Sequence, residues 1–170
     1  MGKLQWDTFV KKIYIKATIP DLYKLWATKK GITSWFLRDA LYTTLRGDKR
    51  KPEEYIEKGD LYSWYWHNWD GKEAGTVIEA NGKDYIKISF AKSTVTIKFE
   101  HKNNATLIIL TQFEIPDDEE NKMNIFYGCS NGWTFWLANL KAFVEHEILL
   151  NETDINLQEH ELSCYEFVNM

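Results

Sequence analysis

Cysteine and proline are scarce in this chain of 170 residues, which contains two cysteines and three prolines. Cys129 and Cys164 form no CxxC pair, so we predict no disulfide framework and expect a reduced, cytoplasmic protein. No apolar run approaches the ~20 residues that span a bilayer, and the first residues lack the apolar stretch of a secretory signal. The sequence therefore predicts no membrane span and no export.

Positive charge is also in short supply. The chain has 21 Lys and Arg against 25 Asp and Glu, a net charge of −4, which argues against a partner bound through nucleic-acid phosphates. The 4 histidines show no HExxH or comparable metal-ligand spacing, and the sequence has neither a glycine-rich phosphate loop nor a GxSxG motif. We therefore predict no metal, no cofactor and no catalytic residue.

Aromatic residues, in contrast, are abundant, with 8 Trp, 9 Tyr and 9 Phe. Segment 124–150 repeats apolar residues at the i, i+3, i+4, i+7 spacing of an amphipathic helix. A helix with so wide an apolar face needs an equally large apolar surface to lie on. That face carries Phe126, Cys129, Trp133, Trp136, Leu137, Leu140, Phe143, Val144 and Ile148.

Most of the preceding chain alternates apolar and polar residues with the period of two that is typical of strands. Pro20 ends the first strand and can occupy the first turn of a helix, so we expect two short helical segments up to residue 37. Turn dipeptides such as Asn81–Gly82 and Asp70–Gly71 separate later strands, which predicts an antiparallel meander. The expected strands cover residues 13–19, 40–45, 61–69, 75–80, 84–90, 94–100 and 105–115.

The order of these elements predicts an α+β protein. Its curved antiparallel sheet of about six to seven strands wraps a long C-terminal helix, and two short helices follow the first strand. We expect residues 1–155 to form a single domain, in which residues 1–12 are a lead-in to the first strand. Residues 156–170 form a tail without a clear period.

The helix sequence CSNGWTFWLANLKAFVEH (129–146) resembles the C-terminal helix of the activator of Hsp90 ATPase homologue 1-like family, within the START-like (SRPBCC) superfamily. The resemblance continues through WATKKGITSWF (26–36), GDLYSWYW (59–66) and LTQFEIPDDEENKMNIFYGCSNGW (110–133), and covers about residues 10–155. It implies a helix-grip fold, in which the sheet grips the last helix and leaves a cavity between them.

Inward side chains of sheet and helices are the candidates for lining that cavity. One interpretation is a pocket for a small molecule, in which Trp N–H groups orient an amphipathic ligand; the other is that the rings fill the space. Glu147 lies near the apolar face of the helix, either at the mouth of the cavity or in solvent, whereas His67 is expected to face outward. The other candidates are Trp26, Trp35, Phe36, Tyr62, Trp64, Trp66, Ile88, Phe90, Ile97, Trp133, Trp136, Leu137 and Leu140.

Two glycines on the outward side of the long helix need an explanation. Gly128 and Gly132 each cost about 1 kcal/mol relative to Ala in a helix, so we expect either close approach by another element or a kink. Phe135 lies on the same side. The N-terminal lead-in, the C-terminal tail or a partner is expected to cover it.

Three function classes are compatible with these features. The first is a non-enzymatic START-like domain that holds a small hydrophobic or amphipathic ligand in its cavity. The second is a protein-interaction module, with a chaperone regulator or a homodimer as examples. The third, implied by the superfamily, is a cyclase or hydrolase, which would need a polar constellation inside the cavity.

Overall fold

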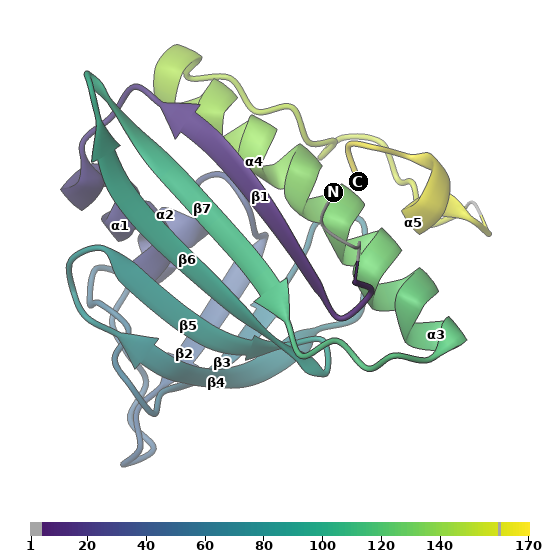
Figure 1. Ribbon diagram of the computed structural model, residues 1–170, viewed down its shortest axis with the longest axis horizontal. Helices are drawn as coiled ribbons and strands as arrows, with labels where there is room; N and C mark the ends of the chain where they lie inside the picture. Colours follow the sequence, from purple (N-terminus) through teal and green to yellow (C-terminus); the bar gives the residue numbers. More distant parts are fainter. Residues whose placement is uncertain (1–4, 160) are drawn as a thin grey trace.

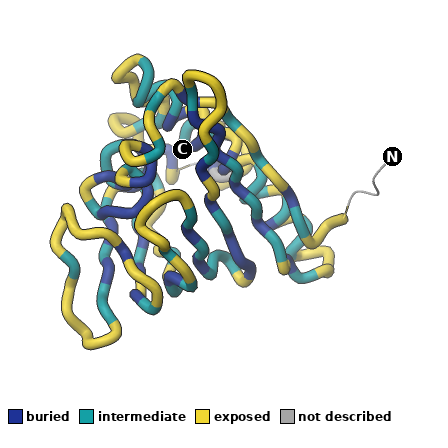
Figure 2. The backbone as a smooth tube through the Cα atoms, turned by 60° about the vertical axis from the view of Figure 1, so that its left-hand side comes forward, coloured by how far each residue is buried: buried dark blue, intermediate teal, exposed yellow. Residues whose placement is uncertain are grey.

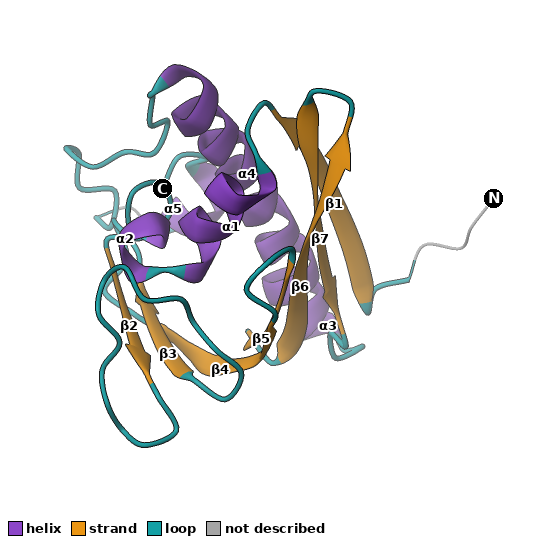
Figure 3. Cartoon of the chain, turned by 90° about the vertical axis from the view of Figure 1, so that its left-hand side faces the viewer, coloured by secondary structure: helices purple, strands orange, loops and turns teal. Residues whose placement is uncertain are grey.

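A seven-stranded antiparallel sheet forms the body of the protein, and the computed structural model describes residues 5–159 and 161–170. The strand order is β1-β7-β6-β5-β4-β3-β2, so β1 crosses over to pair with the last strand while the others form a meander. Figure 3 shows the sheet bending from β2 to β1 around the helices. The strands are β1 (Thr8–Ile15), β2 (Asp39–Thr43), β3 (Leu61–Tyr65), β4 (Glu73–Ala80), β5 (Tyr85–Phe90), β6 (Ser93–Lys102) and β7 (Ala105–Phe113).

A long helix, α4, lies across the concave face of this sheet. Figure 1 shows the C-terminal segment running along the side of this helix that faces away from the sheet. Two contacts tie the end of this helix to β1: Lys141 Nζ donates to the Tyr14 carbonyl at 2.8 Å, and the Lys16 N–H donates to Glu145 Oε1 at 2.8 Å. The helices are α1 (Ile19–Ala27), α2 (Lys29–Ile32), α3 (Glu119–Asn121), the π-helix η1 (Lys122–Tyr127), α4 (Gly128–His146) and α5 (Ser163–Glu166). The predicted fold class is therefore confirmed.

The first strand starts earlier and the third ends earlier than the sequence predicts. Residues 8–12 are not a lead-in, because Thr8 pairs with Phe113 and the whole of β1 is matched along β7. The strand predicted to reach residue 69 ends at Tyr65, and residues 66–72 form a loop in which Asn68 has a φ of 49°. The hairpin turn predicted at Asp70–Gly71 is therefore wrong, because strand pairing has already ended.

The long helix also ends sooner than residue 150. Glu147 has a φ of 57°, and the N–H groups of Glu147 and Ile148 donate to the carbonyls of Phe143 and Ala142. This left-handed cap satisfies the last carbonyls of α4 and turns the chain away from the helix axis. At the other end, the helix begins with the π-helical turn η1, in which Phe126 packs against the core and contacts the rings of Trp6 and Phe9.

The space directly between α4 and the sheet is filled by side chains. The ring centroid of Phe36 lies 5.0–5.6 Å from the ring centroids of Trp64, Trp133 and Trp136. The ring centroids of Trp26 and Trp35 are 4.9 Å apart. Figure 2 shows this buried layer along the inner strands and helices. The rings thus pack against one another in a buried core between α4 and the sheet.

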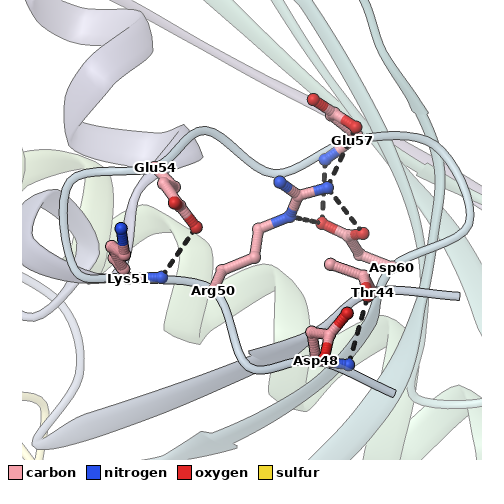
Figure 4. A network of polar contacts seen from close by, with 7 residues as sticks. All are labelled: Thr44, Asp48, Arg50, Lys51, Glu54, Glu57 and Asp60. Carbon is pink, nitrogen blue, oxygen red and sulfur yellow. Dashed lines mark hydrogen bonds and ion pairs between the residues drawn. The ribbon is translucent and has the colours of Figure 1, made fainter. Parts of the chain in front are cut away.

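An ion-pair network organises the long loop between β2 and β3 (Figure 4). Arg50 binds Asp60 through Nε and Nη2 and contacts Glu57, and the Glu57 N–H donates to Asp60 Oδ2 at 2.9 Å. The side chains of Arg50 and Asp60 are only 12% and 2% exposed. The basic run at 46–51 therefore contains one structural arginine, Arg50.

Candidate functional site

A pocket of about 810 Å³ lies on the flank of α4, outside the solid core. Its walls are the first half of α4, the β3–β4 loop, the β5–β6 turn and the C-terminal tail, by which we mean the described residues of 156–170. Most of the lining is aromatic or aliphatic, as is typical of small-molecule sites of this size. The lining residues are Trp66, His67, Trp69, Glu73, Phe90, Ala91, Tyr127, Gly128, Cys129, Asn131, Gly132, Thr134, Phe135, Trp136, Ala138, Tyr165, Phe167, Val168 and Met170.

The two helix glycines face this pocket. A Cβ atom at Gly132 would meet no atom within 4 Å, and one at Gly128 would meet only the Met123 carbonyl oxygen, at 3.6 Å. Close approach by another element, one of the two explanations that the sequence left open, is therefore wrong. Because neither position carries a side chain, the helix surface is cut away at the centre of the pocket.

Ring contacts hold the apolar walls in place. The ring centroid of Trp66 lies 5.6 Å from that of Phe36 in the core and 5.5 Å from that of Trp69. The wall formed by the β3–β4 loop is therefore continuous with the core. On the helix, Phe135 packs edge-on against Trp136 at 5.1 Å. These contacts fix large rings without filling the pocket itself.

Asn68 fastens the tail over the pocket. Its Nδ2 donates to the Glu152 carbonyl at 3.0 Å, and its Oδ1 accepts from the Leu157 N–H at 3.0 Å. Further along, the Tyr165 hydroxyl donates to Asn124 Oδ1 at 3.0 Å. Residues far apart in the sequence thus close one side of the pocket.

Three titratable side chains in the lining come from different elements. Burial lowers the pKa of His67, and the nearby charge of Arg38 lowers it further, so the neutral imidazole is favoured. Burial raises the pKa of Cys129 to about 11, so its thiol stays protonated. Glu73, at the start of β4, accepts a hydrogen bond of 2.9 Å from the Ala91 N–H.

These groups are not arranged as a nucleophile and its base. In the described parts of the chain, His67, Glu73 and Cys129 form no hydrogen bond with one another. A protonated thiol is a poor nucleophile. The geometry can hold and orient a molecule.

The predicted cavity residues divide between the pocket and the core. Trp66, Phe90 and Trp136 line the pocket. The remaining apolar candidates lie in the solid core: Trp26, Trp35, Phe36, Tyr62, Trp64, Ile88, Ile97, Trp133, Leu137 and Leu140.

Two polar predictions need correction. Glu147 is exposed and does not line the pocket, because α4 ends at His146 before the helical face reaches it. The alternation of a strand predicts an outward His67, but β3 ends at Tyr65 and the loop turns the half-buried imidazole into the lining.

Sequence reasoning missed Glu73 and the tail residues of the lining. The tail has no hydrophobic period, so nothing in its sequence shows where it docks. Gly128 and Gly132 did provide a signal. Glycine destabilises a helix relative to alanine, so two glycines on one side of α4 suggest that this side has a role beyond helix formation.

The sequence profile of the family described as "Activator of Hsp90 ATPase homolog 1-like protein" matches residues 16–145. The chain belongs to this family. A comparison with curated proteins found no match.

Solved structures agree with the family's START-like fold. The protein SSP2350 from Staphylococcus saprophyticus has a TM-score of 0.66 at 15% identity, over 84% of this chain and 94% of its own. The Aha1 dimer from Colwellia psychrerythraea has a TM-score of 0.64 at 16% identity, over 82% of this chain and 96% of its own. CalU16 from Micromonospora echinospora gives 0.61 at 15% identity, over 82% and 77%.

Neither a metal-ligand cluster nor a membrane-spanning helix is found in residues 5–159 and 161–170. No group of three or more His, Cys, Asp or Glu side chains there is placed to hold a metal ion. Nor is any helix of that part of the chain long and apolar enough to cross a membrane.

Proposed function

We propose that this protein binds a small hydrophobic or amphipathic molecule in the pocket between α4 and the C-terminal tail. The observation that carries the proposal is the pocket of about 810 Å³, lined by fixed aromatic rings and left open at Gly132. Burial of an apolar ligand there would gain roughly 25 cal/mol for each Å² removed from water. The lining offers positioning groups and no activated nucleophile, so the proposed role is binding and not catalysis.

A direct test is native mass spectrometry of the purified protein after incubation with a lipid and metabolite extract. We expect an adduct of defined mass. A neutral fluorescent probe, N-phenyl-1-naphthylamine, gives a second readout, since Trp66, Trp69 and Trp136 line the pocket and their emission should change on binding. Absence of both an adduct and probe binding would overturn the proposal.

Filling the pocket provides the matched variant. Gly132→Leu places a side chain in open space on α4, and we expect it to abolish probe binding while the protein stays folded. His146→Leu adds the same side chain at an exposed position of α4 that does not line the pocket, so it should bind the probe normally. Equal binding by both variants would place the ligand elsewhere.

Self-association is a second candidate function. Its support is an exposed apolar run just beyond α4, where Ile148 and Leu149 are 53% and 47% exposed, together with the dimer formed by the Colwellia relative. Light scattering after size-exclusion chromatography should then show a dimer that Leu149→Asp converts to a monomer. A monomeric parent protein at high concentration would overturn this candidate.

A further inference from the structure

Glu73 brings a carboxylate to the inner end of the pocket. It is half-buried at the start of β4, opposite Trp64 of β3, and it lines both the main pocket and a smaller adjoining space of about 340 Å³. Its charge is felt across the pocket, because it contributes to raising the pKa of Cys129 on α4. The carboxylate therefore faces the space between β4 and the helix.

A structural role accounts for only part of this side chain. One oxygen, Oε1, accepts from the Ala91 N–H and so steadies a β5–β6 turn in which Ala91 and Lys92 have φ values of 48° and 58°. A glutamine would offer the same acceptor. The negative charge is therefore not needed for the turn.

In the described part of the chain, no cationic side chain pairs with this carboxylate. Lys92 nevertheless lines the adjoining space. The other titratable side chains of the lining are His67, Cys129 and two tyrosines. The pKa shifts of His67 and Cys129 favour their neutral forms. Glu73 is the carboxylate among the residues that line the pocket.

Aromatic rings of the same pocket lining are also suited to a cation. Phe90 and Trp66 line the same pocket, and aromatic faces attract ammonium groups, most strongly where water is excluded. A carboxylate in a partly buried position binds an opposite charge more strongly than one in bulk water. An anionic ligand would meet repulsion at this end and find no Lys or Arg among the lining residues.

We propose that the ligand of this pocket is a cationic amphiphile, with an ammonium group bound by Glu73 and the adjacent rings and an apolar body held between α4 and the C-terminal tail. This inference rests on the proposed function and adds the charge of the ligand to it. It predicts selection by charge among molecules of equal length.

Octylammonium, octanol and octanoate share one chain and differ in charge, so their displacement of N-phenyl-1-naphthylamine isolates the head group. We expect octylammonium to bind about tenfold more tightly than octanol, with octanoate weakest. Glu73→Gln keeps the acceptor for Ala91, and should reduce octylammonium affinity about tenfold while leaving octanol unchanged. Glu79→Gln, at an exposed position of the same strand outside the pocket, is the control and should behave as the parent.

The outcomes separate the two proposals. If octanol displaces the probe as well as octylammonium does, the charge inference is wrong and the binding function stands. If neither the probe nor any of the three compounds binds, the proposed function itself fails. The comparison of the three compounds on the parent protein decides the inference even if Glu73→Gln does not fold.

Discussion

The indole N–H of Trp133 donates a hydrogen bond of 2.9 Å to Gln112 Oε1, and both side chains are buried between α4 and the sheet. Gln112 Nε2 in turn donates to Ser93 Oγ at 2.8 Å, and that hydroxyl donates to the Phe90 carbonyl at 2.6 Å. A continuous series of hydrogen bonds thus joins the helix to the β5–β6 turn. It fixes the helix on the sheet at the edge of the pocket, where apolar packing alone would allow sliding.

The first prediction concerns this series of hydrogen bonds. Trp133→Phe should lower the free energy of unfolding by about 1–3 kcal/mol, because Gln112 Oε1 is left buried without a donor. Urea denaturation measures the change. Trp136→Phe is the control: it makes the same truncation at an indole for which no hydrogen bond is found in the described structure. An equal loss in both variants would show that packing, not the hydrogen bond, dominates.

The second prediction concerns Asn139, which anchors the segment after α4. Its Nδ2 donates to the Trp35 carbonyl at 2.5 Å, and its Oδ1 accepts from the Leu150 N–H at 2.6 Å, in a fully buried position. Asn139→Ala should cost about 2 kcal/mol or more, because it leaves the buried Trp35 carbonyl without its donor and removes the acceptor of the Leu150 N–H. Thermal unfolding measures it, and exposed Asn131→Ala on the same helix should cost far less.

The third prediction concerns the Arg50–Asp60 ion pair. Arg50→Met should destabilise the protein by about 3–5 kcal/mol, since it leaves a buried carboxylate without its partner. Removing both charges in Arg50→Met/Asp60→Leu should recover part of that loss. Chemical denaturation of each variant gives the comparison, with exposed Arg46→Met as the control. A double variant less stable than Arg50→Met would contradict this account.

The fourth prediction concerns the pH dependence of Cys129. Its pKa rises from 9.0 to about 11 on folding, chiefly by burial. The unfolded chain therefore loses the thiol proton at lower pH, and stability should fall as pH rises from about 9 to 11. Cys129→Ala should flatten that slope. Iodoacetamide labelling at pH 8, assigned by peptide mapping, should be slow in the native protein and fast in urea; rapid native labelling would contradict burial.

The fold was predictable because each element leaves a local signal. Period-two runs, turn dipeptides such as Asn81–Gly82 and the apolar face of 129–146 each predict one element. Antiparallel connections then join β2 to β7 in chain order, whereas the pairing of β1 with β7 is long-range. Boundaries failed where backbone geometry overrode periodicity. Glu147, with a positive φ, ends a helix that the side-chain pattern would continue, and Asn68, also with a positive φ, lies in the loop that replaces the predicted end of β3.

The site was harder to predict for a different reason. Periodicity shows which side chains point inward, but not whether they leave space, so most predicted lining residues proved to be core. The pocket depends on contacts between distant segments, such as that of Asn68 with Leu157, which no local pattern encodes. Only the paired glycines of α4 marked its location in advance.

The attachment of the tail through Asn68 has a thermodynamic consequence. Because Tyr165, Phe167 and Val168 form one wall of the pocket, a bound molecule and the docked tail stabilise each other by the same coupling free energy. An occupied pocket should therefore protect the tail from proteolysis. Equally, Asn68→Ala should weaken ligand binding although Asn68 does not line the pocket. A protein or protease that recognises only the undocked tail would therefore respond to whether the pocket holds a ligand.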